Sequence, residues 1–347
     1  MELEGRRIVQ VQKGHDILKH VEAGDFVISM RSFQGGLEYS THTGSVSSAY
    51  VGVTPIKWVE PRFFRHLFKS VTYIQALQST SDLVRDGQAL RFENFSKVAL
   101  PVVPREEQVA IADHLDRETA RIDNLIARKT RFIELLREAI VAAATHVQVN
   151  KDTRWVRLKH VCEQIFRPVE QLAGETYTKL GLYNRGRGIF KKNATDTEDM
   201  GDSDFHWVND GDLIISGQFA WEGSVAMARK EHNNSVVSHR YPILNGRKSE
   251  IISDYLFAYF LTSHGSMVLN DCSRGSAGRN KPLNMNLLMN WKIPVPSIEA
   301  QERIASLVVR KEKLEAIQKK SVALLQEHRI ALITAAVTGK IDLRENA

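Results

Sequence analysis

The stretch PREEQVAIADHLDRETARIDNLIARKTRFIELLREAIVAAATHVQV (Pro104–Val149) decides the fold, because it contains no glycine and no proline after its first residue. Without those helix breakers, the 40 residues from Glu106 to Thr145 are predicted to form one helix. Its length is roughly 60 Å at about 1.5 Å per residue. Pro296–Val337 has the same property, and Gly339 is placed to end its helix. The sequence therefore predicts two long helices, each following a globular segment.

Composition is that of an ordinary folded chain. Its 347 residues favour about two domains, and 43% of them are hydrophobic, which is enough for well-formed cores. The net charge of +6 weakly favours an anionic partner. Cys162 and Cys272 lack metal-ligand spacing, so we expect a reducing compartment and a cytoplasmic location. No apolar run approaches the ~18 residues of a membrane span, so no membrane partner is expected.

The two halves of the chain repeat one another. GDFVIS (Gly24–Ser29) returns as GDLIIS (Gly211–Ser216), at an offset of 211 − 24 = 187 residues. SVSSAY, ending at Tyr50, resembles VVSHRY, and ALRFENFSKVALPVV resembles PLNMNLLMNWKIPVP. Both halves enter their helix through a related junction, with Gln108 matching Gln301. The sequence thus predicts an α+β tandem repeat: a first domain at 1–104, a helix at 105–150, a second domain at 151–296, and a helix with a tail at 297–347.

The repeat is unequal. At the offset of 187, the residues from about Arg154 to Arg187 have no counterpart in the first half. Either the first globule is shorter, or the chain begins inside a once complete domain. In both cases we expect the N-terminal border of the first domain to be a weak point.

Both predicted helices carry an apolar seam with heptad spacing, which favours a two-helix coiled coil over isolated helices. We expect the polar seam residues Lys129, Ser321 and His328 to fix its register. The seam comprises Leu115, Ile122, Leu125, Phe132 and Leu136 in the first helix, and Leu307, Leu314, Ile317 and Leu324 in the second.

A further apolar row lies beside each seam, so the apolar stripe is wider than two helices need. The rows are Ile126, Ile133 and Ile140 in the first helix, and Leu325 and Leu332 in the second. This flank either packs on the chain's own globules or docks the helices of another protein. We assign it to partner binding, with packing as the alternative.

Chain connectivity limits how the helices run. The first helix must deliver the chain to the start of the second globule, so we expect antiparallel packing with the two repeats related by a pseudo-twofold axis. Such an arrangement has the twofold symmetry of a dimer, although both halves belong to one chain.

Common catalytic motifs are absent from the sequence. It has no Walker loop, no His-Glu-x-x-His, no Gly-x-Ser-x-Gly, and no Asn/Asp-Pro-Pro-aromatic run for adenine-amino methyl transfer. We therefore predict no catalytic residue, no metal ligand and no cofactor bound by this chain.

Candidate contacts to nucleic acid lie where the two halves differ within their shared framework. Guanidinium and carboxamide groups form bidentate contacts with base edges, and basic loops follow phosphates. The alternative is that these loops are merely solvated. In the first half the candidates are Arg31, Gln34, Arg85, Gln88 and Arg91; in the second they are Gln218, Trp221, His239, Arg240, Arg274, Arg279, Asn280 and Lys281.

The chain resembles the specificity subunits of type I restriction-modification systems along nearly its whole length. The resemblance rests on the two hexads, on the helix entries ALPVVPREEQVAIADHLD and WKIPVPSIEAQERIASLV, and above all on LLQEHRIALITAAVTGKIDL (Leu324–Leu343). Family members usually begin with a complete first domain, which is where this chain departs from the pattern.

The resemblance implies a non-catalytic subunit with two target-recognition domains, each reading one half of a bipartite, asymmetric site in double-stranded DNA. It also implies two methyltransferase subunits that bring S-adenosylmethionine, and motor-nuclease subunits that use ATP and Mg. The alternative function is a truncated coiled-coil interaction scaffold without sequence-specific DNA binding.

Overall fold

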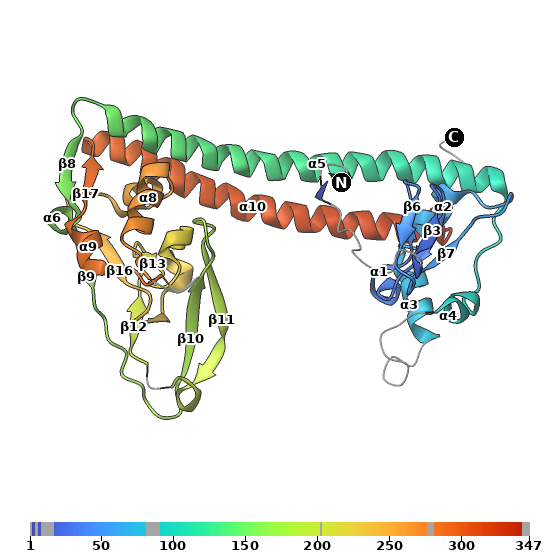
Figure 1. Ribbon diagram of the computed structural model, residues 1–347, viewed down its shortest axis with the longest axis horizontal. Helices are drawn as coiled ribbons and strands as arrows, with labels where there is room; N and C mark the ends of the chain where they lie inside the picture. The colour runs from blue at the N-terminus through green and yellow to red at the C-terminus, as the bar shows by residue number, and fades with distance from the viewer. Residues whose placement is uncertain are drawn as a thin grey trace. The chain divides into compact units, whose positions relative to one another are not determined.

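The computed structural model describes residues 2–3, 6–7, 17–80, 91–201, 203–275 and 281–341. They fall into two compact units: unit 1 is Met1–Lys129 with Lys319–Ala347, and unit 2 is Thr130–Gln318. Two helices of 42 and 40 residues, α5 (Arg105–His146) and α10 (Ile298–Val337), each contribute to both units (Figure 1). The prediction of two long helices is therefore confirmed.

Local sequence explains where α10 begins and ends. The hydroxyl of Ser297 accepts a hydrogen bond from the backbone N–H of Ala300 at 3.3 Å, as an N-cap does. At the other end Gly339 has φ +70°. The backbone N–H of Lys340 donates to the Ala335 carbonyl at 2.9 Å, which closes a Schellman motif. The predicted role of Gly339 in ending this helix is confirmed.

Unit 1 combines short strands with helices around one core. Strands β5 (Glu38–Tyr39), β4 (Phe26–Ile28) and β7 (Val51–Val53) form an antiparallel sheet in that order, and β3 (Lys19–Val21) pairs with β6 (Gly44–Val46). The other elements are β1 (Glu2–Leu3), β2 (Arg6–Arg7), α1 (Ser32–Gly35), α2 (Pro61–Leu67), α3 (Val71–Ser79) and α4 (Phe92–Ser96). Phe26, Phe63 and Phe64 are central to a buried cluster that also includes Leu115 of α5.

Unit 2 contains two four-stranded sheets. One has the order β14 (Val225–Met227), β13 (Leu213–Ile215), β16 (Ile243–Gly246), β9 (Cys162–Ile165); the other has the order β11 (Ile189–Asp196), β10 (Thr176–Leu182), β15 (Ser235–Ser238), β12 (Phe205–Val208). A separate pair joins β17 (Lys292–Val295) to β8 (Arg154–Arg157). The remaining elements are η2 (Val147–Val149), α6 (Leu158–Val161), η3 (Thr197–Asp199), η4 (Ala220–Glu222), η5 (Lys230–His232), α7 (Ser253–Phe260), α8 (Ser263–Asp271) and α9 (Met285–Asn290).

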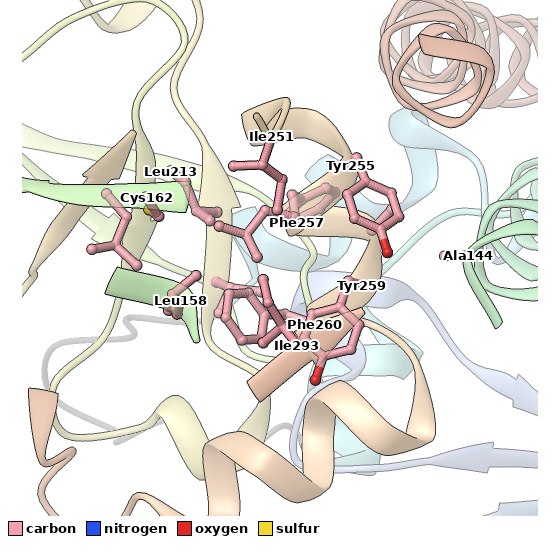
Figure 2. Packing of buried hydrophobic residues seen from close by; sticks show 14 of the residues in the cluster. Ala144, Leu158, Cys162, Leu213, Ile251, Tyr255, Phe257, Tyr259, Phe260 and Ile293 are labelled. Carbon is pink, nitrogen blue, oxygen red and sulfur yellow. The ribbon is translucent and has the colours of Figure 1, made fainter. Parts of the chain in front are cut away.

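The core of unit 2 is built around the aromatic helix α7. Figure 2 shows Tyr255, Phe257 and Tyr259 of this helix in one cluster with Leu213 of β13 and Ile293 of β17. The Tyr255 hydroxyl is buried but donates to the Pro294 carbonyl at 2.8 Å. Because a buried hydroxyl needs such a partner, this bond fixes the helix against β17.

The repeated hexads fold alike. Gly24 and Gly211 have φ values of 104° and 89°, which favour glycine, and each precedes a buried aspartate. The Asp25 carboxylate accepts from the backbone N–H of Glu22 at 2.9 Å, and Asp212 accepts from Asn209 at 2.8 Å. The strands that follow, β4 and β13, are each paired antiparallel on both sides.

The matched glutamines at the helix entries also make the same bonds. Gln108 Oε1 accepts from the backbone N–H of Glu60 at 2.8 Å, and its Nε2 donates to the Val103 carbonyl at 2.7 Å. Gln301 is bonded correspondingly to Ile252 at 2.8 Å and Pro296 at 3.0 Å. Since both amides are buried, they hold each helix to the segment that precedes it.

Within each unit the two long helices run antiparallel. In unit 1 Ile111 of α5 shares a buried cluster with Ile333 and Val337 of α10, while Asp123, farther along α5, pairs with Arg329 at 3.0 Å. Advancing along α5 therefore means moving back along α10. In unit 2 Ile140 of α5 shares the core with Ile304 of α10, and Arg137, earlier on α5, lies near Glu315, later on α10.

The predicted seam needs a correction in its second row. Leu115 and Ile122 are buried, as expected, and Leu136, Leu307 and Leu314 are partly buried. The other four predicted seam residues are largely exposed: Leu125 at 39%, Phe132 at 41%, Ile317 at 60% and Leu324 at 65%. The second row of contacts instead lies one residue farther along each helix, at Ile126 and Ile133 in α5 and at Leu325 in α10.

The rows assigned to partner binding include these residues. Ile140 is buried in the core of unit 2, and Ile126, Ile133, Leu325 and Leu332 are partly buried. Adjacent rows on a helix lie about 100° apart. Both rows here are apolar, so heptad spacing alone does not choose between them. The domain cores contribute at the ends of this row, because Ile140 is part of the core of unit 2 and Leu332 packs against the core of unit 1.

Candidate nucleic-acid interface

Three segments of unit 2 that carry predicted contact residues meet at Gly217, just after β13. The backbone N–H of Gly217 donates to the Arg240 carbonyl at 2.6 Å, and its own carbonyl accepts from Leu283 at 2.8 Å. A Cβ at this position would lie 2.7 Å from the Arg240 carbonyl oxygen, so only glycine permits the close approach. Gln218 and Arg240 are thereby held near one another, and both are exposed.

The same place contains an aromatic ring beneath a cation. Lys281 Nζ lies 4.8 Å from the centre of the Trp221 ring, a cation–π contact. The Trp221 indole N–H is buried without a hydrogen-bond partner among the described residues. Lys281 lies two residues before Leu283, which forms a β-bridge with Ser273. The η4 turn and the segment that begins at Lys281 are therefore joined by direct contact.

The remaining predictions for unit 2 are placed as follows. Arg274 is exposed beside the bridge, and its Nε donates to the Asp271 carbonyl at 3.3 Å. His239 is exposed next to Arg240, and its backbone N–H donates to the Asp204 carbonyl at 2.8 Å. Arg279 and Asn280 lie outside the described residues. The exposed side chains thus offer guanidinium, carboxamide and imidazole groups around one glycine turn.

Unit 1 places its candidates at the corresponding end of β4. Arg31 precedes α1 and Gln34 lies within it, and both side chains are exposed. Gln78, near the end of α3, donates to the Phe33 carbonyl at 2.8 Å, which holds α3 against α1. Arg91, the N-cap residue of α4, is exposed. Asn94 ties α4 to α3 by donating to the Thr80 carbonyl at 2.9 Å. Arg85 and Gln88 lie outside the described residues.

The first candidate in each unit is positioned by the same turn. The backbone N–H of Arg31 donates to the Ser29 hydroxyl at 3.3 Å, and that of Gln218 donates to the Ser216 hydroxyl at 3.4 Å. These serines end the two repeated hexads. One backbone framework therefore presents a guanidinium in unit 1 and a carboxamide in unit 2.

Phe219 was missed by the sequence reasoning. It follows Gln218, is 38% exposed, and its backbone N–H donates to the Ser216 hydroxyl at 3.1 Å. An exposed ring beside a candidate base-reading group could serve as a stacking surface. The signal was available, because GQFAW places two aromatic residues directly after the repeated strand.

The described residues contain no group of three His, Cys, Asp or Glu side chains arranged to hold a metal ion. Burial raises the pKa of the Cys162 thiol to about 12 and that of Cys272 to about 11, so both are neutral at pH 7 and are poor nucleophiles. Across the described part of the chain, no helix is both long and apolar enough to cross a membrane.

No protein-family model matches the chain. The chain is 21% identical over 295 residues to the EcoKI specificity subunit of a type I restriction enzyme from Escherichia coli strain K12. That match covers 77% of this chain but 61% of the relative, so the chain spans less than two thirds of that protein's length.

Solved structures from the same kind of system are also similar. A chain from a study of complex assembly and conformational transition of the type I restriction-modification system has a TM-score of 0.53 at 17% identity, covering 93% of this chain and 84% of that one. The HsdS subunit from Thermoanaerobacter tengcongensis gives 0.47 at 18% identity, covering 93% and 83%. The first of these matches supports the α+β fold class predicted from the sequence, and the resemblance to type I specificity subunits is confirmed.

Proposed function

We propose that this chain, which resembles type I specificity subunits in sequence and fold, is the DNA-recognition subunit of a type I restriction-modification complex. The observation that carries the proposal is the repeated turn at Ser29 and Ser216, which presents Arg31 in one unit and Gln218 in the other. A shared framework with different reading groups fits a bipartite site whose two halves differ in sequence.

Each unit would read one half-site from the end of its repeated strand. In unit 2 Gln218 and Arg240 supply base-edge contacts, Phe219 and Trp221 supply aromatic surface, and Arg274 and Lys281 neutralise phosphates. In unit 1 Arg31, Gln34 and Arg91 have the corresponding roles. The chain itself would be non-catalytic and would act in the cytoplasm.

Methylation and cleavage of DNA would be carried out by other subunits. We propose that two methyltransferase subunits bring S-adenosylmethionine to adenine N6, and that motor-nuclease subunits use ATP and Mg²⁺ to translocate and cleave DNA. Their docking would use apolar helix side chains that remain exposed. They include Leu125 and Leu324 in unit 1, and Phe132 and Ile317 in unit 2. A helix contact that buries such residues gains free energy roughly in proportion to the apolar area covered.

Half-site specificity tests the proposal. The chain is co-expressed with methyltransferase subunits, and the methylated site is read by sequencing. Gln218→Ala should relax or weaken recognition of one half-site by about 1–3 kcal/mol, and Arg31→Ala should do the same to the other. Gln326→Ala, on the exposed face of α10, is the matched control and should leave both halves unchanged.

Two results would contradict the proposal. Methylation or cleavage by the isolated chain would make it an enzyme. Binding without sequence preference at every salt concentration would favour the interaction scaffold, because specific DNA binding weakens steeply as salt rises while base preference persists.

A further inference from the structure

The turn between β10 and β11 of unit 2 presents two arginines that the candidate interface does not include. It reads NRGRG (Asn184–Gly188). Arg185 and Arg187 are exposed, whereas Gly186 between them is buried. A Cβ on Gly186 would lie 2.3 Å from Leu261 Cδ2, and its φ is +60°, so this position favours glycine. The turn therefore packs its glycine inward and leaves both arginine side chains in solvent.

Backbone hydrogen bonds fix this turn to the η4 turn of the candidate interface. The N–H of Arg185 donates to the Glu222 carbonyl at 3.0 Å, and that of Gly186 donates to the Gly223 carbonyl at 2.8 Å. The side-chain amide of Asn184 also donates to the Glu222 carboxylate. The two arginines are thus presented by a segment that is continuous with the candidate interface of unit 2.

Arg185 has a backbone conformation that arginine rarely adopts. Its φ is +59°, in the left-handed region that favours glycine and asparagine. Either of those residues would relieve the strain and keep the same backbone bonds. Because strained positions of this kind cluster at functional sites, an exposed arginine here points to a role for its guanidinium group.

Three guanidinium groups gather at this turn. Arg137 of α5 donates to the Arg185 carbonyl. Burial lowers the pKa of Arg137, and the charges of Arg185 and Arg187 lower it further, while Glu315 opposes them. Within the described part of the chain, no salt bridge is made to Arg185 or Arg187. An anion bound at the turn would relieve the repulsion among these cations.

The carboxylates nearest to the turn have other partners. They are Glu312, which accepts from Arg229 at 2.7 Å, Glu315, which pairs with Lys311, and Glu222, which accepts from Asn184. The positive charge of the two exposed arginines is therefore not neutralised by these groups.

An aromatic ring orients one of the two guanidinium groups. Arg187 Cζ lies 5.6 Å from the centre of the Tyr183 ring, which is 45% exposed. That ring packs in turn on Phe190, with the ring centres 4.8 Å apart. A guanidinium that lies over a ring still directs its N–H groups outward in its own plane. This fork matches two oxygens of a phosphate.

We propose that Arg185 and Arg187 bind phosphates of the DNA duplex that unit 2 reads, so that the β10–β11 turn grips the backbone beside the base contacts. This inference rests on the proposed DNA-recognition function. An acidic protein segment would satisfy the same charges, but continuity of the turn with η4 favours the phosphates of the bound duplex.

The test measures how DNA affinity varies with salt. The full chain is purified with co-expressed methyltransferase subunits, and anisotropy follows binding of a fluorescein-labelled duplex that contains its methylated site. Arg185→Asn combined with Arg187→Gln should reduce the slope of log Kd against log salt concentration by about 1.8, because each lost phosphate contact contributes about 0.9. Asparagine tolerates the φ of +59°, so the turn is kept. Arg187→Gln alone should reduce the slope by about 0.9.

Arg247→Gln is the matched control and should keep the original slope, because this exposed arginine lies at the opposite end of β16 from Arg240. The double variant should lose affinity equally for a duplex in which the half-site relaxed by Gln218→Ala is scrambled, since phosphate contacts carry no base preference.

An unchanged slope in a double variant that retains base preference would overturn this inference alone. Failure of the double variant to assemble with the methyltransferase subunits would identify an acidic protein partner and would also overturn it. A complex of the original chain that prefers no DNA sequence would instead contradict the proposed function.

Discussion

Asp25 and Asp212 occupy the same turn in the two units, but their surroundings differ. Asp212 is fully buried and accepts two bonds from the Arg167 guanidinium, at 2.6 and 3.0 Å, and one from Asn245 at 3.0 Å. For Asp25 the turn bond from Glu22 is the one side-chain bond described. Arg167 lies in the 154–187 stretch that has no counterpart in unit 1. The turn is thus set by the repeat, whereas the buried ion pair depends on the added segment.

The largest expected effect breaks that ion pair. Asp212→Ala should destabilise unit 2 by about 3–5 kcal/mol, because it leaves the partly buried Arg167 guanidinium unpaired. Asp25→Ala should destabilise unit 1 by about 1 kcal/mol, the worth of one local hydrogen bond. Hydrogen exchange of amides in each unit measures both effects. Asp210→Ala, at an exposed carboxylate two residues away, is the control, and equal losses for Asp25 and Asp212 would refute the distinction.

The correction to the predicted seam can be tested within unit 1 by comparing a buried seam residue with an exposed one. Ile122 is 4% exposed and Leu125 is 39% exposed on the same helix. Ile122→Ala should therefore cost about 2–4 kcal/mol through lost burial and a cavity. Leu125→Ala should cost no more than about 1 kcal/mol. Urea unfolding of the two variants gives the comparison, and a larger loss for Leu125 would restore the heptad seam predicted from spacing alone.

The smallest effect is a difference in pH dependence between the units. Burial acts to raise the pKa of Asp116, but bonds from His66 and Arg65 outweigh it and lower that pKa. The stability it gives unit 1 is present above its ordinary pKa of 3.8 and is lost as pH falls through the lowered value. Burial raises the pKa of Glu312 in unit 2, and the bond from Arg229 only partly opposes this.

Because Glu312 binds its proton more tightly in the folded state, unit 2 should gain stability as pH falls from neutral toward 4.5, the ordinary value for that group. Glu312→Gln should flatten this gain, whereas Asp116→Asn should lower the stability of unit 1 above about pH 3.8 and change its pH slope only below that value. Hydrogen exchange of each unit across this range measures the slopes. A loss of unit 2 stability over the same interval, removed by Glu312→Gln, would reverse the predicted sign.

Much of the fold follows from sequence because its signals are local. The glycine-free runs predict α5 and α10, Gly339 predicts where α10 ends, and the two hexads predict the repeat to which β4 and β13 belong. The match of Gln108 with Gln301 reflects an identical set of buried bonds. Such features depend on neighbours in the chain, so their residue types alone suffice.

The sequence did not reveal that the candidate site residues of unit 2 come together in space. Gln218, Arg240 and Lys281 were selected for their chemistry and for their position in divergent loops. Their meeting at Gly217 arises from two backbone bonds between segments far apart in sequence. Phe219 was overlooked because its exposure depends on the η4 turn rather than on any motif.

The sequence by itself determined the helices, the repeat and the shared turns, because each is encoded by backbone preferences and short-range spacing. Only the tertiary structure decided which apolar row faces inward, which aspartate carries a buried ion pair, and which of two matched valines is buried, since Val295 is 1% exposed and Val102 is 90% exposed. Those outcomes depend on what packs against a residue from elsewhere in the chain, and Val102 and Val295 show the difference with the same side chain.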